Sequence, residues 1–204
     1  MGAVTPENMI DAKTVMRLRA MTDAAMMDAK AALEETGGDL AKAAELLRKK
    51  GMAKADKKAE RATKEGLIFS YLHANGKLGA LVELYCETDF VAKTPQFLEL
   101  GHDLALQVAA VNPTYVRRED VPVEIIEKEK EIYRAEIAGQ NKPAEIVEKI
   151  IEGKLNKYYS DNCLLDQLFI KDDTKTVGDI VKEKVGTLGE NMQVGRIARL
   201  NLGE

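Results

Sequence analysis

A hairpin followed by a corner constrains the fold of this chain more than any other segment does. Apolar and polar residues alternate over 67–73, Asn75-Gly76 favours a tight turn between antiparallel strands, and an apolar strand follows as far as Cys86. Thr94-Pro95 then predicts the start of a helix, because proline at the first helical position gives up only an N–H that lacks a helical partner. The intervening residues must therefore turn a corner between a strand and a helix.

Phe90 stands on this corner. A large apolar side chain on a connection between two rigid elements either folds back into the core of its own protein or is held out for another molecule. The pattern alone favours the buried position, and it leaves the exposed one open.

The first fifty residues have the pattern of three short helices. They lie around Val15–Leu18, Met26–Leu33 and Leu40–Leu47. We expect Thr22 or Asp23 to cap the second helix, and Asp39 to cap a third that ends before Gly51. Three short helices bury little surface, so residues 1–51 are more plausible as a docking module than as a catalytic domain.

A charged segment follows this module. Residues 48–64 carry eight basic side chains against two acidic ones, although the whole chain has a net charge of −4. No aromatic residues are interleaved on which bases could stack, so the pattern favours a solvated linker helix over a nucleic-acid site. We assign residues 52–66 to this linker and expect no direct nucleic-acid partner.

Residues 67–204 are predicted to form an α+β core with antiparallel strands flanked by helices. Helices are expected after the prolines at 95, 122 and 143, and another capped by Thr176. The apolar stretch 164–170 predicts a strand that Asp172-Asp173 would break, and residues 193–202 predict the last strand. Helices and hairpins come in runs, without the strand–helix–strand alternation of a doubly wound sheet.

Composition and targeting signals point to a cytoplasmic protein. Hydrophobic residues make up 45% and charged residues 31%, as in ordinary globular proteins. No apolar run approaches the roughly 18 residues of a membrane span, and the first ten residues resemble neither a signal peptide nor a transit peptide. We therefore expect no membrane partner.

Evidence for an enzyme is weak. Cys86 with His73 or His102 would be a nominal nucleophile–base pair, but no oxyanion-binding glycine loop stands nearby, and Cys163 is most simply a buried apolar residue. Phosphate-binding loops, dinucleotide fingerprints and clusters of metal ligands are missing from the sequence. We expect a binding protein that uses no cofactor and no metal ion.

Four segments in collinear order resemble the elongation factor Ts family. They are LRAMTDAAMMDAKAALEETGGDLAKAAELLRKKGMAKADKKAERATKEG, CETDFVAKTPQF, EIVEKIIEGKLNKYY and TVGDIVKEKVGTLGEN. The resemblance implies a guanine nucleotide exchange factor for the GTPase elongation factor Tu, with an N-terminal module like the ubiquitin-associated (UBA) domain. It implies no covalent chemistry on the nucleotide.

The resemblance also assigns roles to residues of the corner. In the family, the aspartate–phenylalanine pair enters the GTPase domain beside the elements that hold Mg²⁺ and the phosphates. At the matching positions here, Phe90 is the wedge, Asp89 its polar neighbour, Thr88 the residue that shapes the corner, and Val91 the next contact. The resemblance thus reverses the preference for a buried Phe90.

The N-terminal module is expected to dock on the same GTPase domain through Arg19, Met26 and Met27. Helical spacing predicts that one of the two methionines faces the core of the module. Where the family commonly reads Thr-Gly-Ala-Gly-Met-Met-Asp-Cys, residues 22–29 read Thr-Asp-Ala-Ala-Met-Met-Asp-Ala. Because both glycines are lost, we expect the backbone angles of this turn to differ.

The length of the chain implies a short form of the family, in which two chains pair to rebuild a two-part core. We expect a homodimer through the final sheet, with Val194, Ile197 and Leu200 of the last strand as candidate contacts. We expect it to be non-covalent because that strand holds no cysteine. Two other functions stay open: a non-exchanging helical adaptor, and a thiol enzyme that uses Cys86.

Overall fold

The computed structural model describes residues 10–139 and 143–203, and its secondary structure is α+β, as predicted. The helices are α1 (Ala12–Thr22), α2 (Met26–Glu35), α3 (Leu40–Asp56), α4 (Asp89–Ala92), α5 (Pro95–Val111), η1 (Arg118–Asp120), α6 (Val123–Ile137), α7 (Ala144–Asn162), η2 (Leu164–Asp166) and α8 (Val177–Leu188). The strands are β1 (Glu65–Leu72), β2 (Leu78–Cys86), β3 (Leu168–Phe169), β4 (Asp172–Thr176) and β5 (Met192–Asn201).

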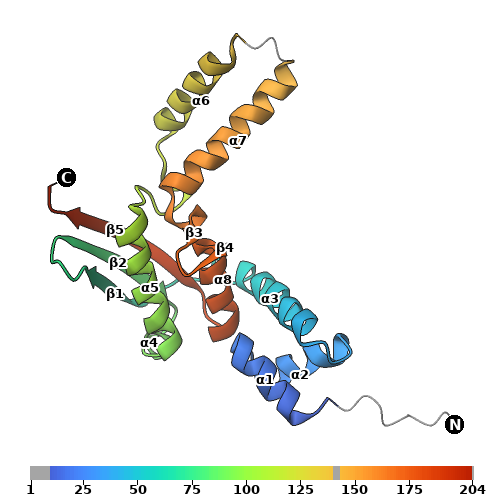
Figure 1. Cartoon of the computed structure of the whole chain (residues 1–204). Coiled ribbons are helices and arrows are strands. Elements are labelled where there is room, and N and C mark those ends of the chain that lie inside the picture. The colour runs from blue at the N-terminus through green and yellow to red at the C-terminus, as the bar shows by residue number, and fades with distance from the viewer. Residues whose placement is uncertain (1–9, 140–142, 204) are drawn as a thin grey trace.

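Three parts of the molecule are visible in Figure 1. Helices α1 to α3 form a module at one end, the sheet with α4, α5 and α8 forms the main body, and α6 and α7 project from that body as a helical hairpin. The corner that carries Phe90 lies in the main body, between β2 and α5.

The N-terminal module has a small core, and side chains cap the starts of α1 and α3. Asp39 caps α3 as predicted, by accepting hydrogen bonds from the backbone of the first turn. The predicted cap of α2 is wrong: α2 begins after Ala25 without a side-chain cap, and Asp23 instead ends α1. The buried residues of the module's core are Val15, Leu18, Ala29, Ala32, Leu33 and Ala43.

Helix α3 does not end before Gly51, as expected, but continues to Asp56. Gly51 lies against Gly186 of α8, so close that a Cβ on Gly186 would be 2.8 Å from the Cα of Gly51. Ala55 is buried in the core of the main body. The first five residues of the expected linker, 52–56, therefore belong to a helix packed on α8. The close approach of two glycines lets α3 bury its last turns there.

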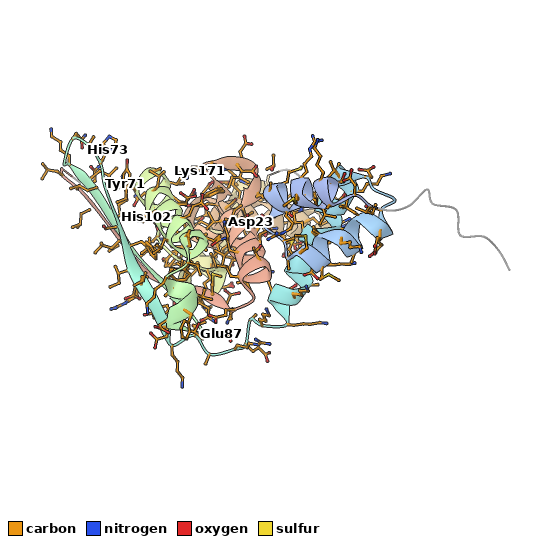
Figure 2. All side chains as sticks on the ribbon, turned by 90° about the horizontal axis from the view of Figure 1, so that it is seen from below. Asp23, Tyr71, His73, Glu87, His102 and Lys171 are labelled. Atoms are coloured by element: carbon orange, nitrogen blue, oxygen red, sulfur yellow. The ribbon has the colours of Figure 1, made fainter. Side chains whose placement is uncertain are left out.

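The large sheet has the strand order β1-β2-β5, and both pairings are antiparallel. Its hairpin turns at Asn75-Gly76 as predicted: Gly76 has a φ of +67°, and the Asn75 side chain accepts a hydrogen bond of 2.9 Å from the backbone of Lys77. Leu72 pairs with Gly79 at this end, and Glu65 pairs with Cys86 at the other. His73 and Glu87 accordingly lie at opposite ends of the hairpin (Figure 2).

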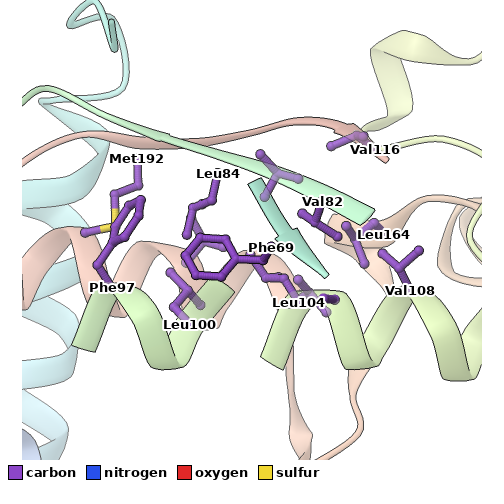
Figure 3. Packing of buried hydrophobic residues seen from close by; sticks show 14 of the residues in the cluster. Phe69, Val82, Leu84, Phe97, Leu100, Leu104, Val108, Val116, Leu164 and Met192 are labelled. Carbon is purple, nitrogen blue, oxygen red and sulfur yellow. The ribbon is translucent and has the colours of Figure 1, made fainter. Parts of the chain in front are cut away.

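The main core lies between one face of this sheet and α5. Phe69, Val82 and Leu84 point from the strands toward Leu100 and Leu104 of the helix (Figure 3). The packing is close enough that α5 needs a glycine at position 101, where a Cβ would lie 2.2 Å from the ring of Phe69.

The segment 164–170 is not the continuous strand that we predicted. Leu164 is buried at the start of the 3₁₀ turn η2, and only Leu168–Phe169 forms a strand. Asp172 belongs to the partner strand β4 instead of breaking the structure. Apolar content alone could not separate a buried turn from a strand.

The last strand was predicted within one residue, but two of its three expected dimer contacts were wrong. Val194 is 2% exposed and pairs with Leu84, and Ile197 packs against the main core. Only Leu200, which is 80% exposed, points away from α5. A register shift in the pairing of β2 with β5 breaks simple alternation along this strand, so that Val194 and Ile197 both face inward.

Candidate partner-binding site

Two consecutive helix caps build the corner after β2. Thr88 precedes the four-residue helix α4, and its side chain accepts a hydrogen bond of 3.5 Å from the backbone N–H of Val91. Thr94 then caps α5 by accepting a bond from the N–H of Phe97, with Pro95 in the first turn as predicted. The chain therefore changes direction twice within a few residues, with each change held by a threonine.

Helix α4 has an inner and an outer side. Ala92 is buried and Val91 packs against the main core, whereas Asp89 and Phe90 are exposed. The ring of Phe90 is 80% exposed, so it does not fill the core of its own protein. The corner thus presents an aromatic ring next to a carboxylate.

The carboxylate of Asp89 has a partner one helical turn away. Its Oδ2 lies 2.6 Å from the Nζ of Lys93, and this hydrogen bond, with the attraction of the negative charge, raises the pKa of the Lys93 ammonium. Both side chains are well exposed, so the pair is worth little to stability and can exchange for contacts with a partner.

Cys86, at the end of β2, also holds the backbone of the corner through a hydrogen bond. Its buried thiol donates a hydrogen bond of 3.1 Å to the carbonyl of Thr88. Burial, together with the nearby negative charge of Glu190, raises the pKa of the Cys86 thiol to about 11, so the donor stays protonated at neutral pH. Burial likewise raises the pKa of Cys163 to about 11.

The structure does not bring Cys86 together with a histidine. His73 lies at the other end of the hairpin, where the hydroxyl of Tyr71 is 3.0 Å from its Nδ1, and His102 packs edge-on against Phe69 with 5.3 Å between ring centroids. A protonated thiol without a base is a poor nucleophile, which argues against the thiol-enzyme hypothesis. In the described part of the chain, no group of three or more His, Cys, Asp or Glu side chains could hold a metal ion.

A loop far away in the sequence also holds the corner. Both oxygens of Glu190 accept hydrogen bonds from Thr88, and Glu87 accepts one of 2.6 Å from the backbone N–H of Asn191. The sequence pattern around residues 189–191 predicts no contact with the corner. The partners are more than one hundred residues apart, so no local pattern could have found them.

The expected docking residues lie together where α1 turns into α2. Arg19 is exposed, and its Nε donates a hydrogen bond of 3.0 Å to the carbonyl of Ala24 in this turn. Met26 and Met27 are 45% and 73% exposed. The expectation that one of them faces the core of the module is wrong, because neither packs into that core. Met26 precedes Ala29 on the same side of α2, but it is the first residue of the helix.

The turn tolerates the loss of its first glycine. Asp23 has φ 52° and ψ 14°, in the left-handed region, and its N–H bonds to the carbonyl of Arg19 as a helix-ending residue does. Aspartate is one of the few side chains that adopt this conformation at low cost. Ala25, at the second missing glycine, is extended.

Comparison with known proteins decides the family. The family model described as Elongation factor TS matches residues 12–204, nearly the whole chain. The chain belongs to the elongation factor Ts family. The protein named elongation factor Ts in Fervidobacterium nodosum is 55% identical to this chain, over 96% of this chain and 99% of the relative. The Thermotoga petrophila protein of that name is 58% identical, over 93% of this chain and 94% of the relative. The Maridesulfovibrio salexigens protein of the same name is 56% identical over 96% and 95%.

Membership in the elongation factor Ts family supports a role as a nucleotide exchange factor in translation elongation, rather than as an enzyme with covalent chemistry. Among the residues that the structure describes, no helix is long and apolar enough to cross a membrane.

Proposed function

We propose that this chain binds elongation factor Tu·GDP in the cytoplasm and promotes GDP release by inserting Asp89 and Phe90 beside the site of Mg²⁺ and the phosphates. The observation that carries the proposal is the ring of Phe90, which is 80% exposed on a corner whose backbone is held from several sides. Nucleotide affinity in such GTPases depends on Mg²⁺ and on backbone N–H groups around the phosphates, so a wedge that displaces either weakens binding.

The wedge does not act alone. Burial of one phenylalanine is worth about 2 to 3 kcal/mol, which is roughly two powers of ten in an equilibrium constant. By linkage, the exchange protein must bind the nucleotide-free partner more tightly than the nucleotide-bound partner. The ratio of these two affinities equals the factor by which it lowers the partner's affinity for the nucleotide. Further contacts must supply the rest, and we assign them to Arg19, Met26 and Met27 of the module, with Thr88 and Val91 flanking the wedge.

Release of fluorescently labelled GDP from elongation factor Tu, followed by stopped flow, tests the wedge. We expect Phe90→Ala to lower the maximal release rate by about a hundredfold, in line with the burial energy above, while leaving the thermal unfolding midpoint unchanged. Val123→Ala is the control, because Val123 is 71% exposed at the start of α6, away from the corner. Normal exchange by Phe90→Ala would refute the insertion mechanism.

The same measurement separates exchange from the alternative of a non-exchanging adaptor. An adaptor would bind elongation factor Tu without accelerating release at any concentration of the chain. Exchange predicts a release rate that rises with concentration and then saturates.

A second copy of this chain is the partner that we propose for the outer face of the sheet. Opposite to α5, this face exposes Ile68, Leu72, Leu81 and Leu200, and Leu72 and Leu200 flank Gly79 across the three strands. Apolar patches of this kind mark interaction sites, and a two-fold axis lets one patch cover its own copy. Of the three contacts predicted from the sequence, this surface includes only Leu200. Ile68, Leu72 and Leu81 take the place of Val194 and Ile197.

Sedimentation equilibrium tests the homodimer. Leu200→Lys places a charge in the proposed interface, so we expect it to raise the dimer dissociation constant at least tenfold, with unchanged helix content by circular dichroism. Val123→Lys is the matched control on another surface. A wild-type chain that sediments as a monomer at micromolar concentration would refute the dimer.

A further inference from the structure

We propose that Glu190 is a positioning residue for nucleotide exchange, which fixes through Thr88 the direction in which the corner presents Phe90. This inference rests on the proposed function. It concerns a residue in the loop between α8 and β5, remote in sequence from the corner itself.

The contact between Glu190 and Thr88 is bidentate. Oε2 of Glu190 accepts a hydrogen bond of 3.0 Å from the backbone N–H of Thr88, and Oε1 accepts one of 2.7 Å from its hydroxyl. The same hydroxyl oxygen accepts from the N–H of Val91 in the first turn of α4. Hydrogen bonds to an ionised acceptor are stronger than neutral ones, so Glu190 holds both the residue that caps α4 and, through it, the turn that carries Phe90.

The loop that carries Glu190 is itself anchored. Asn191 is 3% exposed, and its side chain donates hydrogen bonds of 3.1 and 2.7 Å to the carbonyls of Ala59 and Arg61. Its backbone N–H bonds to Glu87, whose carboxylate lies 3.7 Å from the guanidinium of Arg61. The loop therefore connects the segment after α3 with the corner, and Glu190 is held on a fixed base.

The corner needs such support because of the exposure of Phe90. A ring with few neighbours of its own gains no direction from packing, so its placement depends on the backbone beneath it. If the backbone is already ordered before binding, less conformational entropy is lost when the complex forms. Thr88 is held at its N–H and hydroxyl by Glu190, and at its carbonyl by Cys86.

Glu190→Ala and Glu190→Gln test the proposal in the stopped-flow GDP-release assay with elongation factor Tu. We expect Glu190→Ala to lower the maximal release rate about tenfold, the size that follows from losing hydrogen bonds to a charged group. Glu190→Gln keeps one acceptor oxygen and should lose less. The half-saturating concentration should change less than the maximal rate, because the docking residues of the module are untouched.

The control is Glu99→Ala, which removes an exposed glutamate of α5 that pairs with Lys184 and takes no part in the hydrogen bonds of Thr88. We expect wild-type exchange from it. Amide hydrogen exchange gives a second readout: the N–H of Val91 should exchange faster in both Glu190 variants, whereas amides of the central strand β2 should not. Unchanged protection at Val91 would overturn the inference.

A double-mutant cycle tests whether Glu190 acts through Thr88. Thr88→Val keeps the shape of the side chain but removes its hydroxyl. If the two residues act as one unit, the combined loss of maximal rate in Thr88→Val/Glu190→Ala should be clearly smaller than the product of the single losses. Independent, multiplicative losses would overturn the inference.

The outcome separates this inference from the proposed function. If Phe90→Ala exchanges normally, the insertion mechanism fails, and the positioning role fails with it. If Phe90→Ala is impaired while folded Glu190→Ala reaches the wild-type maximal rate, only the positioning role is refuted.

Discussion

The corner and the N-terminal module both expose apolar side chains, but the cores that support these side chains differ in size. Phe90 is 80% exposed on a short helix whose inner residues belong to the large core of the main body. Met27 is 73% exposed on a module whose own core holds six buried residues, three of them alanines. Remote hydrogen bonds also hold the corner, whereas the described contacts of α1 and α2 are mainly with each other and with α3.

This difference suits two kinds of contact. Phenylalanine has a rigid ring, and it can enter a defined place only if the backbone beneath it is fixed. Methionine has three rotatable bonds and a polarisable sulfur, so it adapts to a partner surface even when its support is less rigid. We therefore expect substitutions at the corner to change the maximal release rate, and substitutions in the module to change the concentration at which exchange saturates.

The two regions are joined where α3 crosses α8. Here Gly51 and Gly186 face each other, Lys182 pairs with Asp56 at 2.9 Å, and Lys58 donates a hydrogen bond to the carbonyl of Gly189. Gly189 directly precedes Glu190, so the end of α3 is tied to the loop that holds the corner. The spacing between the module and the corner depends on this junction.

Of the two substitutions that test this comparison, Gly186→Ala and Met27→Ala, we expect Gly186→Ala to change stability and exchange more. Its Cβ would lie 2.8 to 3.0 Å from backbone atoms of Gly51, which cannot move aside as a flexible side chain could, so the helices must separate. Overpacking of this kind costs about 1 to 3 kcal/mol. We expect a lower thermal unfolding midpoint and a half-saturating concentration raised by about tenfold or more in GDP release, since about 1.4 kcal/mol corresponds to a factor of ten.

Gly153→Ala is the matched control for this substitution. Gly153 lies within α7, where a Cβ would have no neighbour within 4 Å from elsewhere in the described part of the chain, so alanine there should stabilise the helix by about 0.5 to 1 kcal/mol. Similar stability changes in the two variants would show that the crossing of α3 and α8 does not hold the module in place.

Local chemistry allowed several parts of this arrangement to be predicted. Asn75-Gly76 specified the hairpin turn, Thr94-Pro95 the start of α5, and Thr176 the start of α8, because each effect acts within a few residues of its cause. The resemblance to a family, not the pattern, corrected the placement of Phe90. Pattern favours burial of a large apolar residue, and it cannot register a role in binding.

The contacts that the sequence did not reveal all depend on tertiary structure. Helix α3 passes Gly51 because α8 offers a surface there, and Val194 and Ile197 face the same side because the register of β2 and β5 shifts. Glu190 meets Thr88 only because α8 returns the chain to the end of β2. Propensity and periodicity carry no information about such partners.

Met27→Ala should give the smaller effect and sharpen the comparison most directly. The side chain is largely exposed in the free chain, so its loss should leave the thermal unfolding midpoint unchanged. If it becomes buried against elongation factor Tu, its removal should raise the half-saturating concentration by about tenfold, since a buried methionine is worth about 1.5 to 3 kcal/mol and alanine retains part of it. The maximal release rate should stay at the wild-type value, because the corner is intact. Met16→Ala, on α1 of the same module and 61% exposed, is the control, and an equal effect from both would mean that Met27 has no special place in docking.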